Sequence, residues 1–323
     1  MMNTSIQPMD LEIIFISFIS AITIIYFIYN KKVLNSAISV NYHFTRQCNY
    51  KCKFCFHTNT NSFVLPVEKA KHGLKKLCNA GMKKINFSGG EPFTQPKFIG
   101  ELVKYCKETL KIESVTIVSN GSLIKNRWFD IYGKYIDILA ISCDSNNEDT
   151  LEKIGRYQKG KEHIKQLKRI RYLCKKHNIL FKINTVVCSE NWQEDMSDLI
   201  NLVKPARWKV FQCLLIDGEN AGQNALRDAK KMVVTKEQFN HFCNTHKELK
   251  CLVPESNELM RNSYFILDEY MRFLNNVNGK KEPGLSILDT DISVAIDNSG
   301  FDRKSFYKRG GKYKWSKGNN LDW

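Results

Sequence analysis

Several features that define common protein classes are missing from this sequence of 323 residues. It shows no internal repeat and no low-complexity tract. Its 11 cysteines are too few, and odd in number, for a disulfide-bonded scaffold, and most are scattered through apolar segments as expected of reduced thiols. A hydrophobic fraction of 43% with 25% charged residues excludes a disordered chain and allows a sizeable core.

Acidic residues are also scarce relative to basic ones. The 33 Asp and Glu residues face 49 Lys and Arg residues, which gives a formal net charge of +16. Such a balance favours an anionic partner: nucleic acid, membrane headgroups or a phosphorylated small molecule. The charge alone does not choose among these.

Charge is absent altogether from residues 13–29 (IIFISFISAITIIYFIY). As a helix this stretch would reach about 25 Å, the short end of a bilayer span. We interpret it as a transmembrane anchor, with an in-plane interfacial helix and a cleaved signal peptide as alternatives. Lys31 and Lys32 behind it would hold the following domain in the cytosol.

Apolar strands alternate with amphipathic helices over residues 39–216. Strands are expected at 39–44, 84–88, 114–119, 137–142, 180–187 and 209–215, and helices at 66–80, 98–110, 163–177 and 196–203. The alternation predicts an α/β fold, a parallel sheet curled into a partial (β/α)6 barrel with its site at the carboxyl ends of the strands.

The remaining residues are expected to flank this barrel. Residues 1–38 would form the membrane anchor and a linker, and residues 217–323 a C-terminal extension that closes the barrel mouth. Within the extension, helices are expected at 236–249 and 263–274, followed by a basic, glycine-containing end (KRGGK, 308–312).

Three cysteines follow the first expected strand in the spacing C-x3-C-x2-C: Cys48, Cys52 and Cys55. Three thiolates can hold three irons of a [4Fe–4S] cluster and leave the fourth iron with an open position. A structural zinc ion with His43 or His57 as fourth ligand is the alternative. The spacing leaves both open.

The sequence SGGEP (88–92) ends the second expected strand. Two glycines there would let the backbone approach a ligand closely, and exposed N–H and C=O groups could bind the ends of an amino acid. An ordinary tight turn has the same appearance.

Basic side chains recur at alternating strand positions. Lys182 and Asn184 share one face of their strand, Arg207 and Lys209 share one face of the next, and Lys84 opens the second strand. Because no acidic residue matches them in the same strands, we expect a buried anion, most naturally a triphosphate.

The cysteine spacing and GGEP, in this strand order, resemble the radical S-adenosylmethionine (SAM) superfamily. The resemblance implies a [4Fe–4S] cluster whose open iron binds the methionine end of SAM, and a 5′-deoxyadenosyl radical that takes a hydrogen atom from the substrate. It implies SAM contacts at Ser88, Gly89, Gly90, Glu91, Asn120, Ser142 and Arg156.

Longer stretches, among them NYHFTRQCNYKCKFCFHT and RWKVFQCLLI, resemble one branch of this superfamily, the interferon-associated antiviral nucleotide dehydratases. This resemblance implies conversion of CTP to 3′-deoxy-3′,4′-didehydro-CTP (ddhCTP), a chain terminator of viral RNA synthesis, by abstraction of the ribose C4′ hydrogen. It places the triphosphate on Lys84, Lys182, Arg207, Lys209, Lys281 and Arg309, with Ser88 and Asn184 near the nucleotide.

The same resemblance suggests further roles. Tyr264 is a candidate proton or electron donor, although a packed core tyrosine is the commoner role. Trp323 would contact the cytosolic iron–sulfur assembly machinery, and residues 11–29 the cytosolic face of the endoplasmic reticulum or lipid droplets. Residues 11–29 are more uniformly apolar than the amphipathic membrane helix of that branch. No direct binding of nucleic acid by this protein is expected.

Two alternatives to this function remain. The same chemistry on UTP or another nucleoside triphosphate is one, because phosphate contacts do not read the base. The other is a membrane-bound antiviral scaffold without catalysis, in which the cysteines hold zinc or a structural cluster.

Overall fold

The computed structural model describes residues 20, 39–157, 160 and 162–311. Apart from Ser20, the predicted anchor lies outside these residues, as does Trp323. Among the helices of the described part, none is both long enough and apolar enough to cross a membrane.

A ten-stranded sheet runs through the described chain in the order β10-β9-β8-β1-β2-β3-β4-β5-β6-β7. Each neighbouring pair from β8 through β7 is parallel, whereas β9 and β10 are antiparallel to their neighbours. The strands are β1 Ser39–His43, β2 Lys84–Ser88, β3 Ser114–Ser119, β4 Ile138–Ser142, β5 Leu180–Val187, β6 Arg207–Gln212, β7 Leu252–Glu255, β8 Phe265–Leu267, β9 Arg272–Asn275 and β10 Glu282–Ser286.

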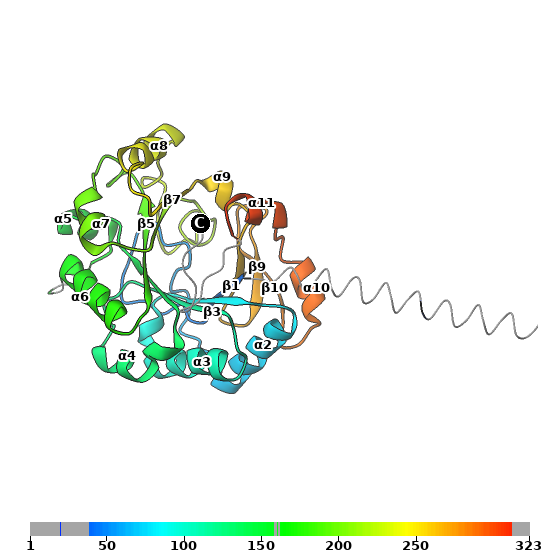
Figure 1. Cartoon of the computed structure of the whole chain (residues 1–323). Helices are drawn as coiled ribbons and strands as arrows, with labels where there is room; N and C mark the ends of the chain where they lie inside the picture. The colour runs from blue at the N-terminus through cyan, green and yellow to red at the C-terminus, as the bar shows by residue number, and fades with distance from the viewer. Residues whose placement is uncertain (1–19, 21–38, 158–159, 161, 312–323) are drawn as a thin grey trace, which may run out of the picture.

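Helices follow one another around the outside of the curved sheet, as Figure 1 shows for α2, α3, α4, α6 and α7. The α-helices of the described chain are α2 Val67–Asn79, α3 Pro96–Glu108, α4 Asn126–Tyr132, α5 Glu148–Ile154, α6 His163–Lys176, α7 Ser197–Val203, α8 Lys236–Thr245, α9 Asn257–Met260, α10 Ile292–Asp297 and α11 Arg303–Lys308.

The two faces of the sheet differ in chemistry because side chains alternate along each strand. One face carries the large apolar residues, which are fully or almost fully buried and pack with the helices in one core; they include Tyr42, Phe87, Ile117, Leu139, Phe181 and Trp208. The register places polar residues on the other face, among them Asn41, Asn86, Lys182 and Lys209. The inner face is therefore the place for a polar ligand.

The six predicted strands and the parallel α/β fold are confirmed. β2, β3 and β5 have the predicted bounds, and β6 begins two residues earlier than predicted, at Arg207. The helix predicted at 236–249 is α8, which ends at Thr245.

The helix predicted at 263–274 is wrong, because β8 and β9 occupy this segment. The Asp268 carboxylate accepts hydrogen bonds from the backbone N–H groups of Tyr270 and Arg272, at 3.0 and 2.9 Å, and so stabilises a turn between the two strands. Met271 in this turn has a φ of 60°, which a helix does not allow.

The residues after 216 extend the sheet at both edges. β7 pairs with β6, and β8 pairs with β1. Pro254 lies in β7 at the edge of the sheet, where its missing N–H costs no ladder hydrogen bond. Closure of the barrel mouth by the predicted extension stays a prediction.

The apolar face yields a stability prediction. Phe87 is 0% exposed, and we expect Phe87→Ala to lower the free energy of unfolding by about 3–5 kcal/mol, because it removes buried surface and leaves a cavity. Urea unfolding followed by circular dichroism measures the change. Tyr172→Ala on α6 is the control, since Tyr172 is 67% exposed. Equal losses in both variants would contradict the proposed core.

Candidate active site

The cysteine loop, residues 45–58, leaves the carboxyl end of β1 and contacts the end of α5. The N–H groups of Lys51 and Lys53 donate to the carbonyls of Gly155 and Ile154, at 3.2 and 2.9 Å. A side chain at residue 155 would place its Cβ 2.5 Å from the Lys51 carbonyl oxygen, and the φ of +85° there also favours glycine. Gly155 thus allows the loop to lie directly on the helix end.

The cluster cysteines, Cys48, Cys52 and Cys55, carry free, partly exposed thiols. Burial raises the pKa of Cys48 to about 11 and that of Cys52 to about 12. The protein alone therefore keeps these thiols neutral, and a bound metal group must displace their protons.

Positive charge and N–H donors surround the sulfurs. The buried Arg156 guanidinium favours the thiolate form of all three cysteines and itself forms an ion pair with Asp144. The N–H of Tyr50 and the side-chain amide of Asn120 donate to Cys48 Sγ at 3.4 and 3.9 Å. Because N–H donors and a nearby cation stabilise cluster thiolates, this set fits a [4Fe–4S] cluster.

The two histidines of the zinc alternative lie side by side, at the end of β1 and at the end of the cysteine loop. Their rings lie 4.5 Å apart, and His57 Nδ1 accepts a hydrogen bond from Lys281 Nζ at 3.1 Å. Burial lowers the pKa of His43 and His57 well below the usual value. Across the described ranges, no three His, Cys, Asp or Glu residues are grouped to share one metal ion.

The glycines of SGGEP bring two chain segments together. The N–H of Gly90 donates to the Thr45 carbonyl and that of Glu91 to the Gln47 carbonyl, both at 2.7 Å. A Cβ at Gly90 would lie 2.1 Å from the Gln47 oxygen. The cysteine loop therefore uses these two N–H groups, and contact of the other backbone groups of SGGEP with a ligand stays a prediction.

Glu91 fixes the next predicted SAM residue. Its fully buried carboxylate accepts from the Ser119 hydroxyl, the Phe93 N–H and the Asn120 N–H, at 2.7, 3.0 and 2.7 Å. Burial raises the pKa of Glu91, while these hydrogen bonds oppose the rise. The carboxylate therefore orients Asn120 towards Cys48. Direct contact of Glu91 with SAM stays a prediction.

The other predicted SAM residues end neighbouring strands. Ser88 ends β2 and precedes Gly89, and Ser142 ends β4, where its carbonyl oxygen lies 3.0 Å from His163 Nε2. Ser88 pairs with His43 directly before the cysteine loop, and Arg156, just behind α5, lies beside Cys52. The structure thus places these predicted SAM residues at or near the carboxyl ends of the strands.

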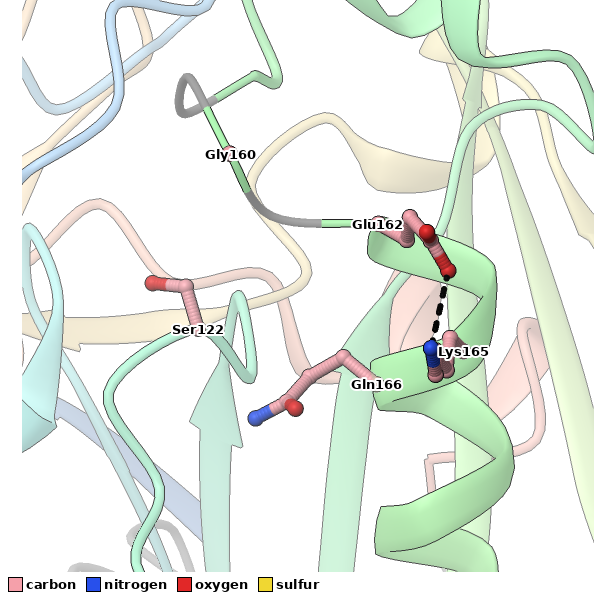
Figure 2. A pocket seen from close by; sticks show the side chains of 5 residues that line it. All are labelled: Ser122, Gly160, Glu162, Lys165 and Gln166. Carbon is pink, nitrogen blue, oxygen red and sulfur yellow. Dashed lines mark ion pairs between the residues drawn. The ribbon is translucent and has the colours of Figure 1, made fainter.

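A hollow lies beside these residues, between the Asn120 loop and α6 (Figure 2). It is lined by Ser122, Gly160, Glu162, Lys165 and Gln166, none of which was predicted as a site residue. Glu162 and Lys165 form an ion pair of 3.6 Å, and Asn49 Nδ2 of the cysteine loop donates to Ser122 Oγ at 2.8 Å. The hollow therefore borders the first half of the loop.

Four cationic side chains lie close together on one side of the sheet. Lys182 lies on the inner face of β5, Arg207 and Lys209 lie on that of β6, and Arg309 lies beside them after α11. These four residues are called the cation cluster. The register pairs Lys182 with Arg207, and Asn184 with Lys209. Burial, reinforced by the neighbouring cations, lowers the pKa of Lys182 to about 7 and that of Lys209 to about 8.

One acidic residue, Glu255 on β7, lies within this cluster and was missed. It forms an ion pair with Lys209, and Arg309 Nη1 lies 3.8 Å from its carboxylate. Although burial raises the pKa of Glu255, these cations hold it below the usual value. The expectation concerned acidic residues in the same strands, and Glu255 comes from the neighbouring strand β7, which that expectation did not consider.

Tyr264 lies in the cation cluster. Its hydroxyl donates to Glu255 and accepts from Lys209 Nζ at 2.9 Å, and the Arg309 guanidinium lies 3.7 Å from the centre of its ring. The structure thus brings together Lys182, Arg207, Lys209, Arg309 and Tyr264.

Two predicted phosphate residues lie apart from this cluster. Lys84 is buried on the same inner face but on β2, with β3 and β4 between it and β5. Lys281 contacts the end of the cysteine loop instead. Beside Lys84, Asn86 Nδ2 donates to Asn41 Oδ1 at 3.1 Å, a pair that strand alternation could have identified.

Known proteins match most of this chain. The radical SAM superfamily matches residues 42–228. S-adenosylmethionine-dependent nucleotide dehydratase RSAD2 of Danio rerio is 59% identical over 288 residues, 88% of this chain and 80% of the relative. Its namesake of Oncorhynchus mykiss is 56% identical over 303 residues, 90% and 87% of the two chains.

A solved structure shows the same fold. Streptococcus suis SuiB bound to precursor peptide SuiA superimposes with a TM-score of 0.62 at 17% identity, over 84% of this chain and 66% of that chain.

The cysteine loop yields a prediction about metal content. Cys52→Ala is expected to lose bound iron after anaerobic reconstitution, since only two cluster thiolates remain. His43→Ala is expected to keep it. Iron analysis and the visible spectrum measure both, with Cys78→Ala on α2 as the matched cysteine control. Iron loss in His43→Ala, with zinc bound to the wild type, would instead support the zinc site.

The cation cluster yields a pH prediction. Lys182 and Lys209 lose protons from about pH 7 upward in the free protein, whereas a bound polyphosphate retains them. Affinity for a nucleoside triphosphate should therefore fall above about pH 7, by up to about tenfold per unit for each lysine. The terminal phosphate of such a nucleotide, with a pKa of about 6, is already ionised over this range and adds little.

Isothermal titration calorimetry from about pH 7 to about pH 9 measures this affinity together with proton uptake. Lys182→Arg keeps its charge over the range and should show a shallower decline. An affinity that is constant with pH in the wild type would contradict the assignment.

Proposed function

The chain belongs to the radical SAM superfamily and, within it, to the viperin (RSAD2) nucleotide dehydratases, and from this premise we propose that it converts CTP to ddhCTP. It is accordingly a radical SAM dehydratase with a [4Fe–4S] cluster and SAM as cofactors. The observation that carries the choice of substrate class is the cation cluster, which gathers Lys182, Arg207, Lys209 and Arg309 on and beside two neighbouring strands. Such a group of buried cationic side chains suits a triphosphate.

The cofactors fit the residues around the cysteine loop. When bound, the cluster and SAM supply a 5′-deoxyadenosyl radical that abstracts the ribose C4′ hydrogen. Cys48, Cys52 and Cys55 would hold three irons, and Arg156 and Asn120 stabilise the anionic sulfurs. The ends of β2 and β4 would receive SAM.

The nucleotide would lie along the inner face of the sheet. The register forms a row from Ser142 through Asn184 to Lys209, which joins the proposed SAM residues to the cation cluster. The side-chain oxygen of Asn184 is buried without a hydrogen-bond partner in the part of the chain that is described. A ribose hydroxyl would satisfy it, with the phosphates on Lys182, Arg207, Lys209 and Arg309.

Tyr264 is proposed as the proton donor. Dehydration removes the C4′ hydrogen and the 3′ hydroxyl, and it needs one electron and one proton in addition. The Tyr264 hydroxyl is held between Glu255 and Lys209, beside the proposed phosphates. Lys209 can restore a proton to it, because the two groups are hydrogen-bonded.

Antiviral action and the cellular site belong to the same proposal. We propose attachment through residues 11–29 to the cytosolic face of the endoplasmic reticulum or lipid droplets, and delivery of the cluster through Trp323. Both segments lie outside the described residues, apart from Ser20. The uncharged stretch 13–29 supports the membrane contact.

The nucleotide is tested directly with purified, cluster-reconstituted protein, SAM and dithionite. CTP should raise 5′-deoxyadenosine above the level without nucleotide and give a product lighter by one water. UTP, ATP and GTP are run beside it, because phosphate contacts do not distinguish bases. A larger rise in 5′-deoxyadenosine with UTP would show that UTP, and not CTP, is the preferred substrate.

A matched pair of variants tests the proposed phosphate site. Arg207→Met should raise the KM for CTP by about tenfold or more, since it removes a buried charge-assisted contact. Lys236→Met, at an exposed position in the first turn of α8, should leave it unchanged. If no pyrimidine triphosphate raises 5′-deoxyadenosine, the proposed nucleotide reaction is wrong.

A further inference from the structure

A second buried charge network lies behind the cysteine loop and is separate from the cation cluster. The carboxylate of Glu219, in the loop after β6, is its centre. It accepts hydrogen bonds from the Thr58 N–H and the Thr58 hydroxyl, both at 2.7 Å, and from Arg46 Nη1 at 2.9 Å. Because Arg46 and Thr58 lie at opposite ends of the cysteine loop, Glu219 ties the two ends together.

Asn220 continues this contact to the middle of the loop. It is 0% exposed, and its amide donates to the Phe54 carbonyl at 3.0 Å, between the second and third cysteines. The same amide donates to the Leu214 carbonyl, and its oxygen accepts from the Ile216 N–H at 2.7 Å. Asn220 is therefore rigidly held by its own loop and can fix the position of Phe54.

The cysteine loop is thus held from two sides. Its first half contacts the end of α5 through Lys51 and Lys53, and its second half contacts Glu219 and Asn220. The second cysteine lies between the two contacts to α5, and the third lies between the contacts of Phe54 and Thr58. A shift of either set would therefore change the spacing of the sulfurs.

Lys281 is the cation of this network that the resemblance assigns to the phosphates of the nucleotide. Its buried ammonium group donates to the Phe56 carbonyl and to His57 Nδ1 at 3.1 Å, and it lies 3.5 Å from Glu219. An ammonium group has three N–H donors, and all three are used. A phosphate oxygen can accept one of these N–H groups only if it replaces a present acceptor. The contact of Lys281 Nζ to Glu219 is the longest of the three, so Glu219 is the acceptor most readily replaced.

The charges of the network balance without a ligand. Arg46 and Lys281 face Glu219 and Glu269, and Arg46 Nε lies 2.9 Å from Glu269. A phosphate that binds Lys281 adds negative charge next to Glu219. In a buried site with little solvent screening, two anions compete for one cation.

We propose that Glu219 and Asn220 form a positioning clamp on residues 54–58 of the cysteine loop, and that Lys281 makes this clamp respond to the phosphates of the nucleotide. The clamp itself depends only on contacts within the chain, whereas the response of Lys281 rests on the proposed function. Nucleotide binding would shift Lys281 from Glu219 to phosphate while its bond to the Phe56 carbonyl persists. The cysteine loop, and with it the cluster, would sense whether substrate is bound.

Asn220→Ala tests the clamp without nucleotide. The variant loses the hydrogen bond to Phe54, and we expect iron to leave the reconstituted protein about tenfold faster under a chelator, the size expected for one buried hydrogen bond. Asn244→Ala, at an exposed position of α8, is the matched control and should lose iron at the wild-type rate. Thermal unfolding shows whether both variants are folded. Iron loss at the wild-type rate from folded Asn220→Ala would overturn the clamp.

Glu219→Gln tests the response to nucleotide. It keeps the oxygen that accepts from Thr58 but removes the charge that competes for Lys281. We expect normal iron content, but a loss of the change that CTP causes in the electron paramagnetic resonance spectrum of the reduced cluster. The CTP-dependent rise in 5′-deoxyadenosine should fall about tenfold, as expected for a lost charge-assisted contact.

The control for this variant is Glu248→Gln at an exposed position, which should respond as the wild type does. A full spectral response in Glu219→Gln would overturn the role of Lys281. If the wild type responds to no nucleotide, the proposed function fails and the Lys281 response fails with it. Faster iron loss from Asn220→Ala would still support the clamp.

Discussion

The candidate site depends on close contact between the backbone of the cysteine loop and the chain around it. Two glycines permit this contact: Gly90 lies against Gln47, and Gly155 lies against Lys51. A side chain at either position would have to push the loop away from its neighbours. Because the contacts are made by backbone groups, the path of the cysteine loop is set by the fold itself.

Burial of charge is the second constraint, and it follows from the sheet. Its inner face carries polar residues and its outer face carries the apolar core, so charged groups on the inner face are removed from water. Two of the buried cations form an ion pair with a carboxylate. Arg156 pairs with Asp144 beside the sulfurs, and Lys209 on the inner face pairs with Glu255. Under the proposed function, the cations of β5 and β6 would also bind the phosphates of the nucleotide.

The elements that depend only on neighbouring residues could be predicted from the alternation of apolar and polar residues and from residue spacing. The strands from β1 to β6 and the cysteine spacing could be identified because alternation and spacing involve neighbouring residues. The turn at Asp268 was missed since it depends on one side chain that bonds to the backbone ahead of it. Glu255 was missed because its short strand contains a proline. Glu219 lies 161 positions from its partner Thr58, a distance over which no local pattern operates.

The positions of the two charged regions restrict how a substrate can lie. The cation cluster occupies β5 to β7, whereas the cysteine loop leaves β1 and lies on α5. The row from Ser142 through Asn184 to Lys209 joins them on the inner face. A ligand whose phosphates lie on the cluster must extend along this row to bring a hydrogen atom near SAM. Asn184 lies at the middle of the row, and its buried side-chain oxygen has no hydrogen-bond partner among the described residues. Under the proposed function, Asn184 would orient the sugar while the cation cluster binds the phosphates, so recognition of charge and placement of the reacting carbon would be tasks of different residues on neighbouring strands.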